Sequence, residues 1–313
     1  MKTDWINIAL ASDDNYAQHV SVVMASVLLN TKHRNRIRFF LLSDTIDNNK
    51  IMLLQETVSS LGAKLVIINI NNCEFNNVYL SGHVSKAAYF RLKLADILPF
   101  DVHKIIYLDV DLLVFEDIVE VWETNIYNKP IAAVPDYGIM ASARLMKQKA
   151  TVIGFGEEDI YFNSGVLIID VDQWREKAFA QQVLNLVETT QLPHHDQDAL
   201  NKVFINNWYA LPLKWNVIPP VFCLFTKILF SIKFRQAAII AKKNPAIFHY
   251  AGRYKPWEFG KKNGFNDKYY DYLRETSFKD VKMPKPSKNM RGKSLLRQTL
   301  RIKLADIWCK IFG

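Results

Sequence analysis

The chain has 313 residues, half of them hydrophobic and 23% charged, so it can bury a sizeable core in one large domain, with or without an appendage. Its three cysteines, Cys73, Cys223 and Cys309, are odd in number and far apart, which excludes a disulfide framework or a cysteine-based metal site and fits a reducing cytoplasm. The sequence contains no uninterrupted signal-peptide core and no charge-free apolar run of about 18 residues, as a membrane-spanning helix requires.

Strand and helix patterns alternate along the chain. Short apolar runs predict strands at residues 7–12, 37–43, 64–70, 104–114, 131–135 and 166–170. Helical spacing of apolar residues predicts helices at residues 19–29, 48–61, 85–98 and 173–188. Apolar strands separated by helices of this length indicate βαβ units and a parallel sheet that is buried on both faces.

Two carboxylates, of Asp109 and Asp111, lie within the apolar run at residues 104–114. Residues i and i+2 of a strand point to the same side, so both acids are expected to face one point in space. Such a pair can hold a hard divalent cation and leave other coordination positions open for substrate phosphates. The alternative is a pair of ordinary solvated acids at a strand end.

The position of this pair in the predicted sheet favours a nucleotide site. Ligands of open sheets bind outside the carboxyl ends of the strands, where both 12–16 and 109–111 are expected to lie. Neither a glycine-rich dinucleotide fingerprint nor a Gly-Lys-Ser/Thr phosphate loop occurs in the chain. If the sheet binds a nucleotide diphosphate, a metal must therefore neutralise the phosphates.

Three further polar clusters are candidates for the same site. Residues 161–166 place Asn163 and Gly165 before an apolar strand, either as an ordinary turn or to contact a sugar hydroxyl. Residues 194–201 resemble a helix start, with Asp196 as a possible N-cap. Residues 247–257 end a strand with His249, a residue that is more often structural than a ligand beside apolar neighbours.

Taken in order, these motifs resemble glycosyltransferase family 8, the retaining enzymes that include bacterial lipooligosaccharide galactosyltransferases and glycogenin. The resemblance spans most of residues 6–260. The motifs that carry it are residues 11–16 (ASDDNY), 89–92 (YFRL), 107–111 (YLDVD), 162–166 (FNSGV), 196–198 (DQD), 249–252 (HYAG) and 255–257 (KPW). It implies a fold of the glycosyltransferase A type, a Rossmann-like mixed α/β sheet flanked by helices, with residues 1–278 as the catalytic domain.

The resemblance also implies a role for each matched residue. Asp109, Asp111 and His249 would hold Mn²⁺, which a histidine among carboxylates suits better than Mg²⁺, although Mg²⁺ stays possible. Gly252 and Lys255 would hold the diphosphate of a UDP-sugar. The remaining matches are Ala11, Asp13 and Asn15 for uridine, Arg91, Asn163, Asp196 and Gln197 for the hexose, and His83 and Asp136 near the site without a firm role.

The implied reaction transfers a hexose from a UDP-sugar with retention of configuration. Lys255 and the metal would stabilise the negative charge that develops on UDP. Retention could proceed through a covalent adduct on Asp196 or Gln197, or by same-face attack of the acceptor, which we favour as a hypothesis. Galactose is the preferred donor sugar, with glucose as the alternative.

The C-terminal region bears on the acceptor. An apolar, aromatic segment at 218–230 is either a buried connection or a flap over the acceptor. Basic residues are concentrated at 279–313, which hold ten Lys or Arg and two Asp, a net charge of +8 out of +9 for the whole chain. After residue 286 the apolar side chains form one helical stripe, which consists of Leu296, Leu300, Leu304, Ile307 and Ile311.

This combination predicts an amphipathic tail on an anionic membrane surface. Peripheral attachment to the inner face of the cytoplasmic membrane would bring the enzyme to a lipid-linked acceptor such as nascent lipopolysaccharide core. A terminal helix packed on the domain, or a disordered tail, is the alternative.

Other functional classes compete with this interpretation. A nucleic-acid-binding protein is suggested only by the sequence pI of about 9.2, and no recognition motif accompanies it. A UDP-sugar-binding protein without transfer activity would have no need of Lys255 as a leaving-group residue. A transferase acting on a protein or glycogen-type primer would have no obvious use for the basic tail.

Overall fold

A computed structural model describes residues 4–71, 75, 78, 86–156, 158–222, 232–252, 255–259 and 264–280. His83, most of the apolar segment 218–230 and the tail beyond residue 280 lie outside the described residues. The expectations for these parts of the chain therefore stay predictions.

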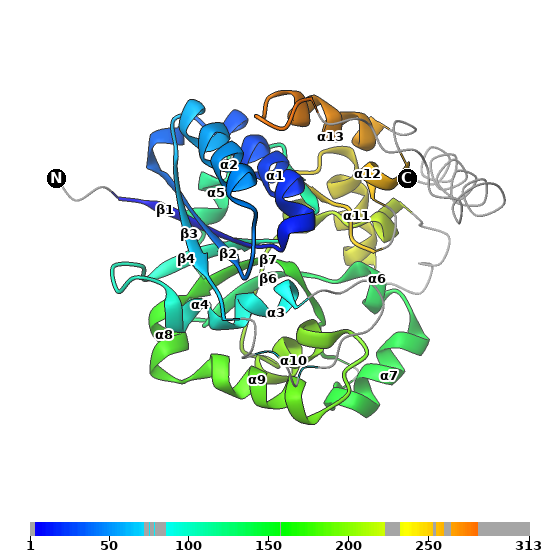
Figure 1. Cartoon of the computed structure of the whole chain (residues 1–313). Coiled ribbons are helices and arrows are strands. Elements are labelled where there is room, and N and C mark those ends of the chain that lie inside the picture. The colour runs from blue at the N-terminus through cyan, green and yellow to red at the C-terminus, as the bar shows by residue number, and fades with distance from the viewer. Residues whose placement is uncertain are drawn as a thin grey trace.

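The core of the described chain is a seven-stranded sheet with the strand order β3-β2-β1-β4-β7-β6-β8 (Figure 1). Its strands are β1 (Ile6–Ala11), β2 (Ile37–Ser43), β3 (Lys64–Asn69), β4 (Lys104–Leu108), β6 (Ile131–Pro135), β7 (Phe162–Asp170) and β8 (Tyr209–Ala210). The first four are parallel, as the βαβ pattern predicts, but β7 runs antiparallel to both β4 and β6. The sheet is therefore mixed, as the family resemblance implies, and only its first half is parallel throughout.

Helices cover both faces of the sheet because successive strand residues point to opposite sides. In β1, Ile8 and Leu10 pack with α1 (Ala17–Leu29), α2 (Asn48–Ser60) and α13 (Gly264–Arg274), whereas Ala9 and Ala11 belong to a second core. The second core lies under α3 (Ala87–Phe90), α4 (Leu94–Ile97), α8 (Val171–Glu176), α9 (Phe179–Thr189) and α10 (His195–Val203). Figure 1 shows these two helical layers above and below the strands.

The remaining helices, several 3₁₀ turns and a second small sheet complete the described fold. They are α5 (Val119–Trp122), α6 (Tyr137–Met140), α7 (Ala143–Ile153), α11 (Ile232–Lys243), α12 (Pro256–Phe259) and the 3₁₀ turns Asp14–Tyr16, Arg34–Arg36, Arg91–Lys93, Leu213–Asn216 and Pro219–Phe222. A separate two-stranded antiparallel sheet pairs β5 (Leu112–Val114) with β9 (Ile247–His249).

Three predicted elements are interrupted in the structure. The helix expected at 85–98 consists, in its described part, of α3, a 3₁₀ turn and α4. The helix expected at 173–188 is broken at Ala178, whose φ of 50° is left-handed and separates α8 from α9. The strand expected at 104–114 is two strands, β4 and β5, which belong to different sheets.

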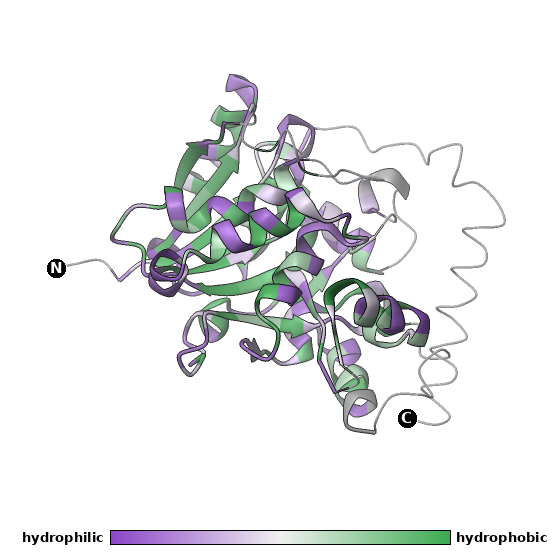
Figure 2. Ribbon diagram, turned by 90° about the horizontal axis from the view of Figure 1, so that it is seen from below, coloured by the Kyte–Doolittle hydropathy of each residue, from purple (hydrophilic) through white to green (hydrophobic). Residues whose placement is uncertain are grey.

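Hydropathy follows this layering. Figure 2 shows hydrophobic residues along the central strands and hydrophilic residues on the outer segments. Within the described parts of the chain, no helix is both long and apolar enough to pass through a bilayer.

The centre of the sheet sets the first prediction. Ile168 of β7 is fully buried and lies between Ile106 of β4 and Ala132 of β6. Ile168→Ala is expected to lower the free energy of unfolding by about 2–5 kcal/mol, because the cavity it leaves cannot fully close. Urea denaturation measures this. Met52→Ala, at a site 65% exposed in α2, is the control and should change it by less than about 0.5 kcal/mol; equal effects would contradict the assigned core.

Candidate active site

A cavity of about 600 Å³ opens at the edge of the sheet where β1 and β4 end. Because β7 is antiparallel, its first residues also lie at this edge, and Gly165 accepts a 2.8 Å hydrogen bond from the Asp109 backbone. Twelve of the fourteen predicted site residues line the cavity, namely Ala11, Asp13, Arg91, Asp109, Asp111, Asp136, Asn163, Asp196, Gln197, His249, Gly252 and Lys255. Asn15 is exposed and is not part of the lining, and His83 lies outside the described residues.

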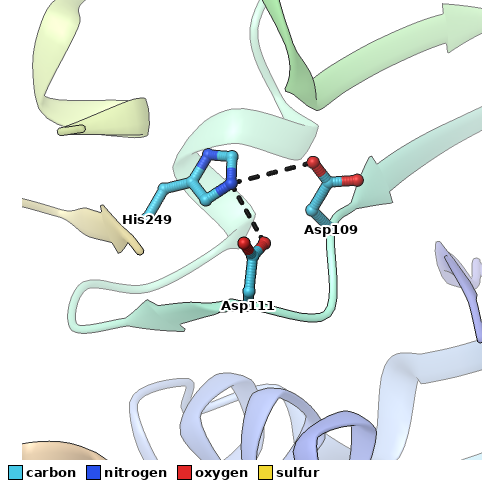
Figure 3. A group of neighbouring side chains, drawn as sticks. All are labelled: Asp109, Asp111 and His249. Carbon is cyan, nitrogen blue, oxygen red and sulfur yellow. Dashed lines mark ion pairs between the residues drawn. The ribbon is translucent and has the colours of Figure 1, made fainter. Parts of the chain in front are cut away.

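The predicted metal ligands form one cluster (Figure 3). One ligand atom from each of Asp109, Asp111 and His249 can be chosen so that all lie within 4.8 Å of one another. His249 Nε2 is 3.0 Å from Asp111 Oδ1 and 3.7 Å from Asp109 Oδ2. The two acids lie in the bend between β4 and β5, so strand alternation is the wrong reason for their convergence. The pairing of β5 with β9 places His249 opposite Leu112 and thus beside both acids.

A neighbouring amide orients the His249 ring. Asn216 uses its Nδ2 to donate to Asn163 Oδ1 at 2.8 Å, so its Oδ1, 2.9 Å from His249 Nδ1, is the acceptor of that contact. His249 Nδ1 therefore carries a proton, and Nε2 faces the carboxylates. Fixing the remote ring nitrogen in this way prepares a histidine to ligate a metal.

The charges of the cluster fit a divalent cation. Burial would raise the pKa of Asp111, but the ion pair with Lys255 and the neighbouring His249 lower it well below its usual range. Burial would lower the pKa of His249, but Asp111 and Asp109 raise it above its ordinary value. Two carboxylates and an imidazole nitrogen are donors that Mn²⁺ accepts readily.

Gly165 makes room for this cluster. A Cβ at this position would lie 2.7 Å from Asp109 Oδ2 and closer still to the His249 ring. Any side chain larger than hydrogen would therefore displace two of the three candidate ligands. The motif around Asn163 lies in β7 (Phe162–Asp170), so the alternative of an ordinary turn is wrong.

Arg91 links the metal cluster to Asp196, which also lines the cavity. Its guanidinium lies 3.0 Å from Asp109 Oδ1 and 3.1 Å from Asp196 Oδ2, and it donates a 2.6 Å hydrogen bond to the Ser164 carbonyl. Burial disfavours its charge, but Asp109 and Asp196 raise the pKa of Arg91 above its ordinary value. Arg91 therefore stays charged in a buried position.

Asp196 keeps one oxygen without a hydrogen bond. Arg91 Nε is close to Oδ2 but donates its hydrogen to the Ala88 carbonyl at 2.8 Å, and no described group donates to this buried oxygen. Burial, opposed in part by Arg91, raises the pKa of Asp196. Asp196 lies in the first turn of α10, whose N-cap is His194, so the alternative of an N-cap role for Asp196 is wrong. Asp196 as a residue lines the cavity, so its carboxylate is a candidate acceptor for a ligand hydroxyl.

Gln197 is fixed by hydrogen bonds through both of its amide atoms. Its Oε1 accepts from the Ser164 amide at 3.0 Å, and its Nε2 donates to Asp136 Oδ2 at 3.1 Å and to Tyr161 Oη at 3.3 Å. Asp136 Oδ2 also accepts from Asn163 Nδ2 at 3.1 Å, and its Oδ1 caps α6 through the Ile139 amide. Asp136, for which the sequence predicts no firm role, therefore positions Gln197 and Asn163.

The remaining predicted residues lie around the mouth of the cavity. Asp13 caps a 3₁₀ turn by accepting from the Asn15 amide at 3.0 Å. Gly252 has a φ of +91°, which favours glycine and lets the backbone pass close to a ligand. Lys255 forms an ion pair with Asp111 and donates to the Tyr250 carbonyl at 2.7 Å.

Several residues of the site are not among the sequence predictions. Tyr16, Tyr107, Ser164 and His194 line the cavity, and each lies next to a quoted motif or within it. Asn216 lies in a 3₁₀ turn outside every motif, and no signal in the sequence singles it out.

Comparison with known proteins identifies the family to which the chain belongs. The model of Glycosyl transferase family 8 matches residues 7–260. The chain belongs to glycosyl transferase family 8. The whole described site, from Ala11 to Lys255, falls within the matched residues, so this family 8 member is a glycosyltransferase.

Individual relatives match most of this chain. General stress protein A of Bacillus subtilis is 30% identical over 288 residues, which cover 90% of this chain and 98% of the relative. The lipopolysaccharide 1,2-glucosyltransferase of Escherichia coli K12 is 23% identical over 82% of this chain and 73% of its own length. The structure of the galactosyltransferase LgtC with donor and acceptor sugar analogs has a TM-score of 0.76 at 23% identity, covering 92% of this chain and 99% of LgtC. This likeness confirms the fold of the glycosyltransferase A type.

The close packing at Gly165 generates the second prediction. Gly165→Ala is expected to weaken Mn²⁺ binding at least about tenfold, because the added methyl group pushes His249 and Asp109 away from the cluster. Isothermal titration of the metal measures this. Gly156→Ala is the control: among the described residues outside its chain neighbours, a Cβ at Gly156 would meet Asp159 alone, at an ordinary 3.5 Å from Oδ2, so the Mn²⁺ affinity of this variant should be unchanged. Unaltered binding by Gly165→Ala would argue against this metal site.

Proposed function

We propose that the chain is a metal-dependent, retaining hexosyltransferase that moves a hexose from a UDP-sugar to a saccharide acceptor. The observation that carries this proposal is the cluster of Asp109, Asp111 and His249 with Lys255 paired to it. A nucleotide-binding sheet without a phosphate loop needs such a cluster, because positive charge must come from a bound cation and a lysine.

Asp109, Asp111 and His249 would hold the metal, Mn²⁺ by preference and Mg²⁺ as the alternative. When bound, the ion supplies positive charge at the diphosphate and lowers the cost of its departure. Lys255 pairs with Oδ2 of Asp111, the carboxylate oxygen that His249 does not contact, and so lies beside the same metal site. Its ammonium can exchange the carboxylate for a phosphate oxygen as the sugar–oxygen bond breaks, which stabilises charge where it develops.

The part of the cavity around Asp196 would hold the sugar. Asp196 lines the cavity, and its carboxylate can accept a hydrogen bond from a hexose hydroxyl. Arg91 lies beside Asp196, Asn163 lines the same cavity, and both would complete the hexose site. Ala11 and Asp13, and Asn15 at the mouth, would contact uridine, with Gly252 at the diphosphate and His83 near the site.

The contacts of Gln197 favour same-face attack over a covalent intermediate. An amide is a poor nucleophile, and the carbonyl oxygen of Gln197 already accepts from the Ser164 backbone. Asp196 is ion-paired with Arg91, which reduces the nucleophilicity of its carboxylate. We therefore propose that the acceptor attacks from the face that UDP leaves, with a leaving phosphate oxygen taking the acceptor proton. A trapped sugar adduct on either residue would overturn this.

The donor and acceptor are proposed from the relatives. A galactosyltransferase and a lipopolysaccharide glucosyltransferase are both among them, and galactose is our preferred sugar over glucose. A lipopolysaccharide or lipooligosaccharide core is the proposed acceptor, and UDP-hexoses followed by a panel of core oligosaccharides would identify both.

Turnover provides the third prediction. With Mn²⁺, the chain is expected to release UDP from UDP-galactose, faster when a core oligosaccharide is added, and a chelator should stop the release. Lys255→Met should lower kcat by about 100- to 1000-fold, the loss expected on removing one charge-stabilising donor. Lys268→Met is the control, because Lys268 is exposed on α13. Binding of UDP-galactose without any UDP release would instead identify a sugar-nucleotide-binding protein.

We also propose that the enzyme works in the cytoplasm on the inner face of the cytoplasmic membrane, with residues 279–313 as its attachment. The sequence pattern supports this: an apolar stripe from Leu296 to Ile311 is accompanied by basic residues that can each contribute about 1 kcal/mol near an anionic surface. A lipid-linked acceptor would then be presented at the same surface.

Vesicle binding tests the proposed attachment. The full chain is expected to sediment with phosphatidylglycerol-containing vesicles, and a chain that ends at Pro286 should not, because it lacks the stripe. Binding should weaken as salt is raised, since the attraction is electrostatic. Neutral phosphatidylcholine vesicles are the control. If the full chain and the truncated chain sediment equally, the tail is not the attachment.

A further inference from the structure

A fully buried lysine lies behind the cavity wall. Lys149 of α7 has no exposed side-chain surface and forms an ion pair of 2.6 Å with Asp198 Oδ1, which is equally buried. Lysine is almost never buried to this extent unless it is paired. Tyr161 Oη also donates to Asp198 Oδ1 at 2.6 Å, so the carboxylate is well satisfied and the lysine has donors left for another partner.

The second partner of Lys149 is His194. Lys149 Nζ lies 2.6 Å from His194 Nδ1. An ammonium group has three donors and no acceptor, so Nδ1 must be the acceptor in this contact. The imidazole is then neutral with its proton on Nε2. Burial and the nearby Lys149 charge also lower the pKa of His194, which agrees with a neutral ring.

The remaining nitrogen of His194 is available to a ligand. Among the described residues, no group hydrogen-bonds to Nε2, and 34% of the side chain is exposed. His194 lines the cavity together with Pro193, His195, Asp196 and Gln197. His195 has a φ of 50°, a left-handed conformation that is costly for histidine and recurs at functional sites. This left-handed residue falls within five consecutive residues that line the cavity.

We propose that Lys149 holds His194 as a neutral Nε2–H donor to a sugar hydroxyl in the cavity. This inference rests on the proposed transfer from a UDP-sugar and adds a specificity residue to it. A hydroxyl fits this donor because His194 brings no net charge and the Lys149–Asp198 pair behind it is neutral overall, whereas a phosphate would favour a cation. The hydroxyl belongs either to the donor hexose or to the acceptor saccharide.

The tautomer can be observed directly. ¹⁵N-histidine NMR of the full chain between pH 6 and 8 is expected to show His194 neutral, with the proton on Nε2 and Nδ1 as a hydrogen-bond acceptor. The resonance is assigned by its loss in His194→Phe. An Nδ1–H tautomer, or an imidazolium at pH 7, would overturn the inference without touching the proposed function.

The ligand is identified by matched variants. His194→Phe keeps the ring and removes the donor, His194→Gln restores a donor, and His103→Phe is the control at a histidine that is 70% exposed. The affinity for UDP-galactose is measured by titration with Mn²⁺, and the KM of the best core oligosaccharide is measured by transfer.

His194→Phe should either weaken the affinity for UDP-galactose or raise the KM of the core oligosaccharide by about tenfold, the effect of one net hydrogen bond. His194→Gln should recover most of this loss. A change in UDP-galactose affinity assigns the hydroxyl to the donor hexose, and a change in acceptor KM assigns it to the acceptor. If both stay within twofold of the unaltered chain, or if only kcat falls, the inference is wrong. If the unaltered chain does not bind UDP-galactose at all, the proposed function fails instead.

Discussion

The site depends on holding three carboxylates, of Asp109, Asp111 and Asp196, together in a largely buried pocket. Three carboxylates in one pocket would repel one another strongly if they were not paired with cations, and burial adds a desolvation penalty for each. The fold places a cation beside every one of them: Arg91 lies between Asp109 and Asp196, and Lys255 pairs with Asp111. A divalent cation would complete this charge balance. The negative charge that destabilises the buried pocket would then also provide the binding site for that cation.

A series of hydrogen-bonded side chains connects the metal cluster to Gln197, in the proposed sugar-binding part of the cavity. Asn216 contacts His249 and Asn163, Asn163 contacts Asp136, and Asp136 accepts from Gln197. Each oxygen and nitrogen in this series has one defined role, so a flip of one amide would leave its neighbours unsatisfied. The hydrogen bonds therefore set the orientation of the His249 ring and of Gln197 at the same time.

Local patterns in the sequence predict most elements and twelve of the residues that the fold brings to one cavity, but not the geometry of that cavity. Strand runs and helical periodicity depend on neighbouring residues, and they located β2 and β6 to the residue. The break at Ala178 and the division of residues 104–114 depend on contacts from distant parts of the chain, β9 in particular. Asn216 and Lys149 are single polar residues without a pattern, and only the fold shows that one orients His249 and the other is buried against Asp198.

The contacts of Gln197 bear on the chemistry as well as on the architecture. A nucleophile needs a lone pair that is free and directed at the anomeric carbon. The carbonyl oxygen of Gln197 accepts from both the amide and the hydroxyl of Ser164, at 3.0 and 3.4 Å, and its amino group donates to Asp136 and Tyr161. Such a side chain is held too firmly to move toward a reacting carbon, but its fixed dipole can orient a sugar. For the hexosyl transfer proposed above, this hydrogen bonding favours a role of Gln197 in positioning the hexose, with the bond-making left to the acceptor and the leaving phosphate.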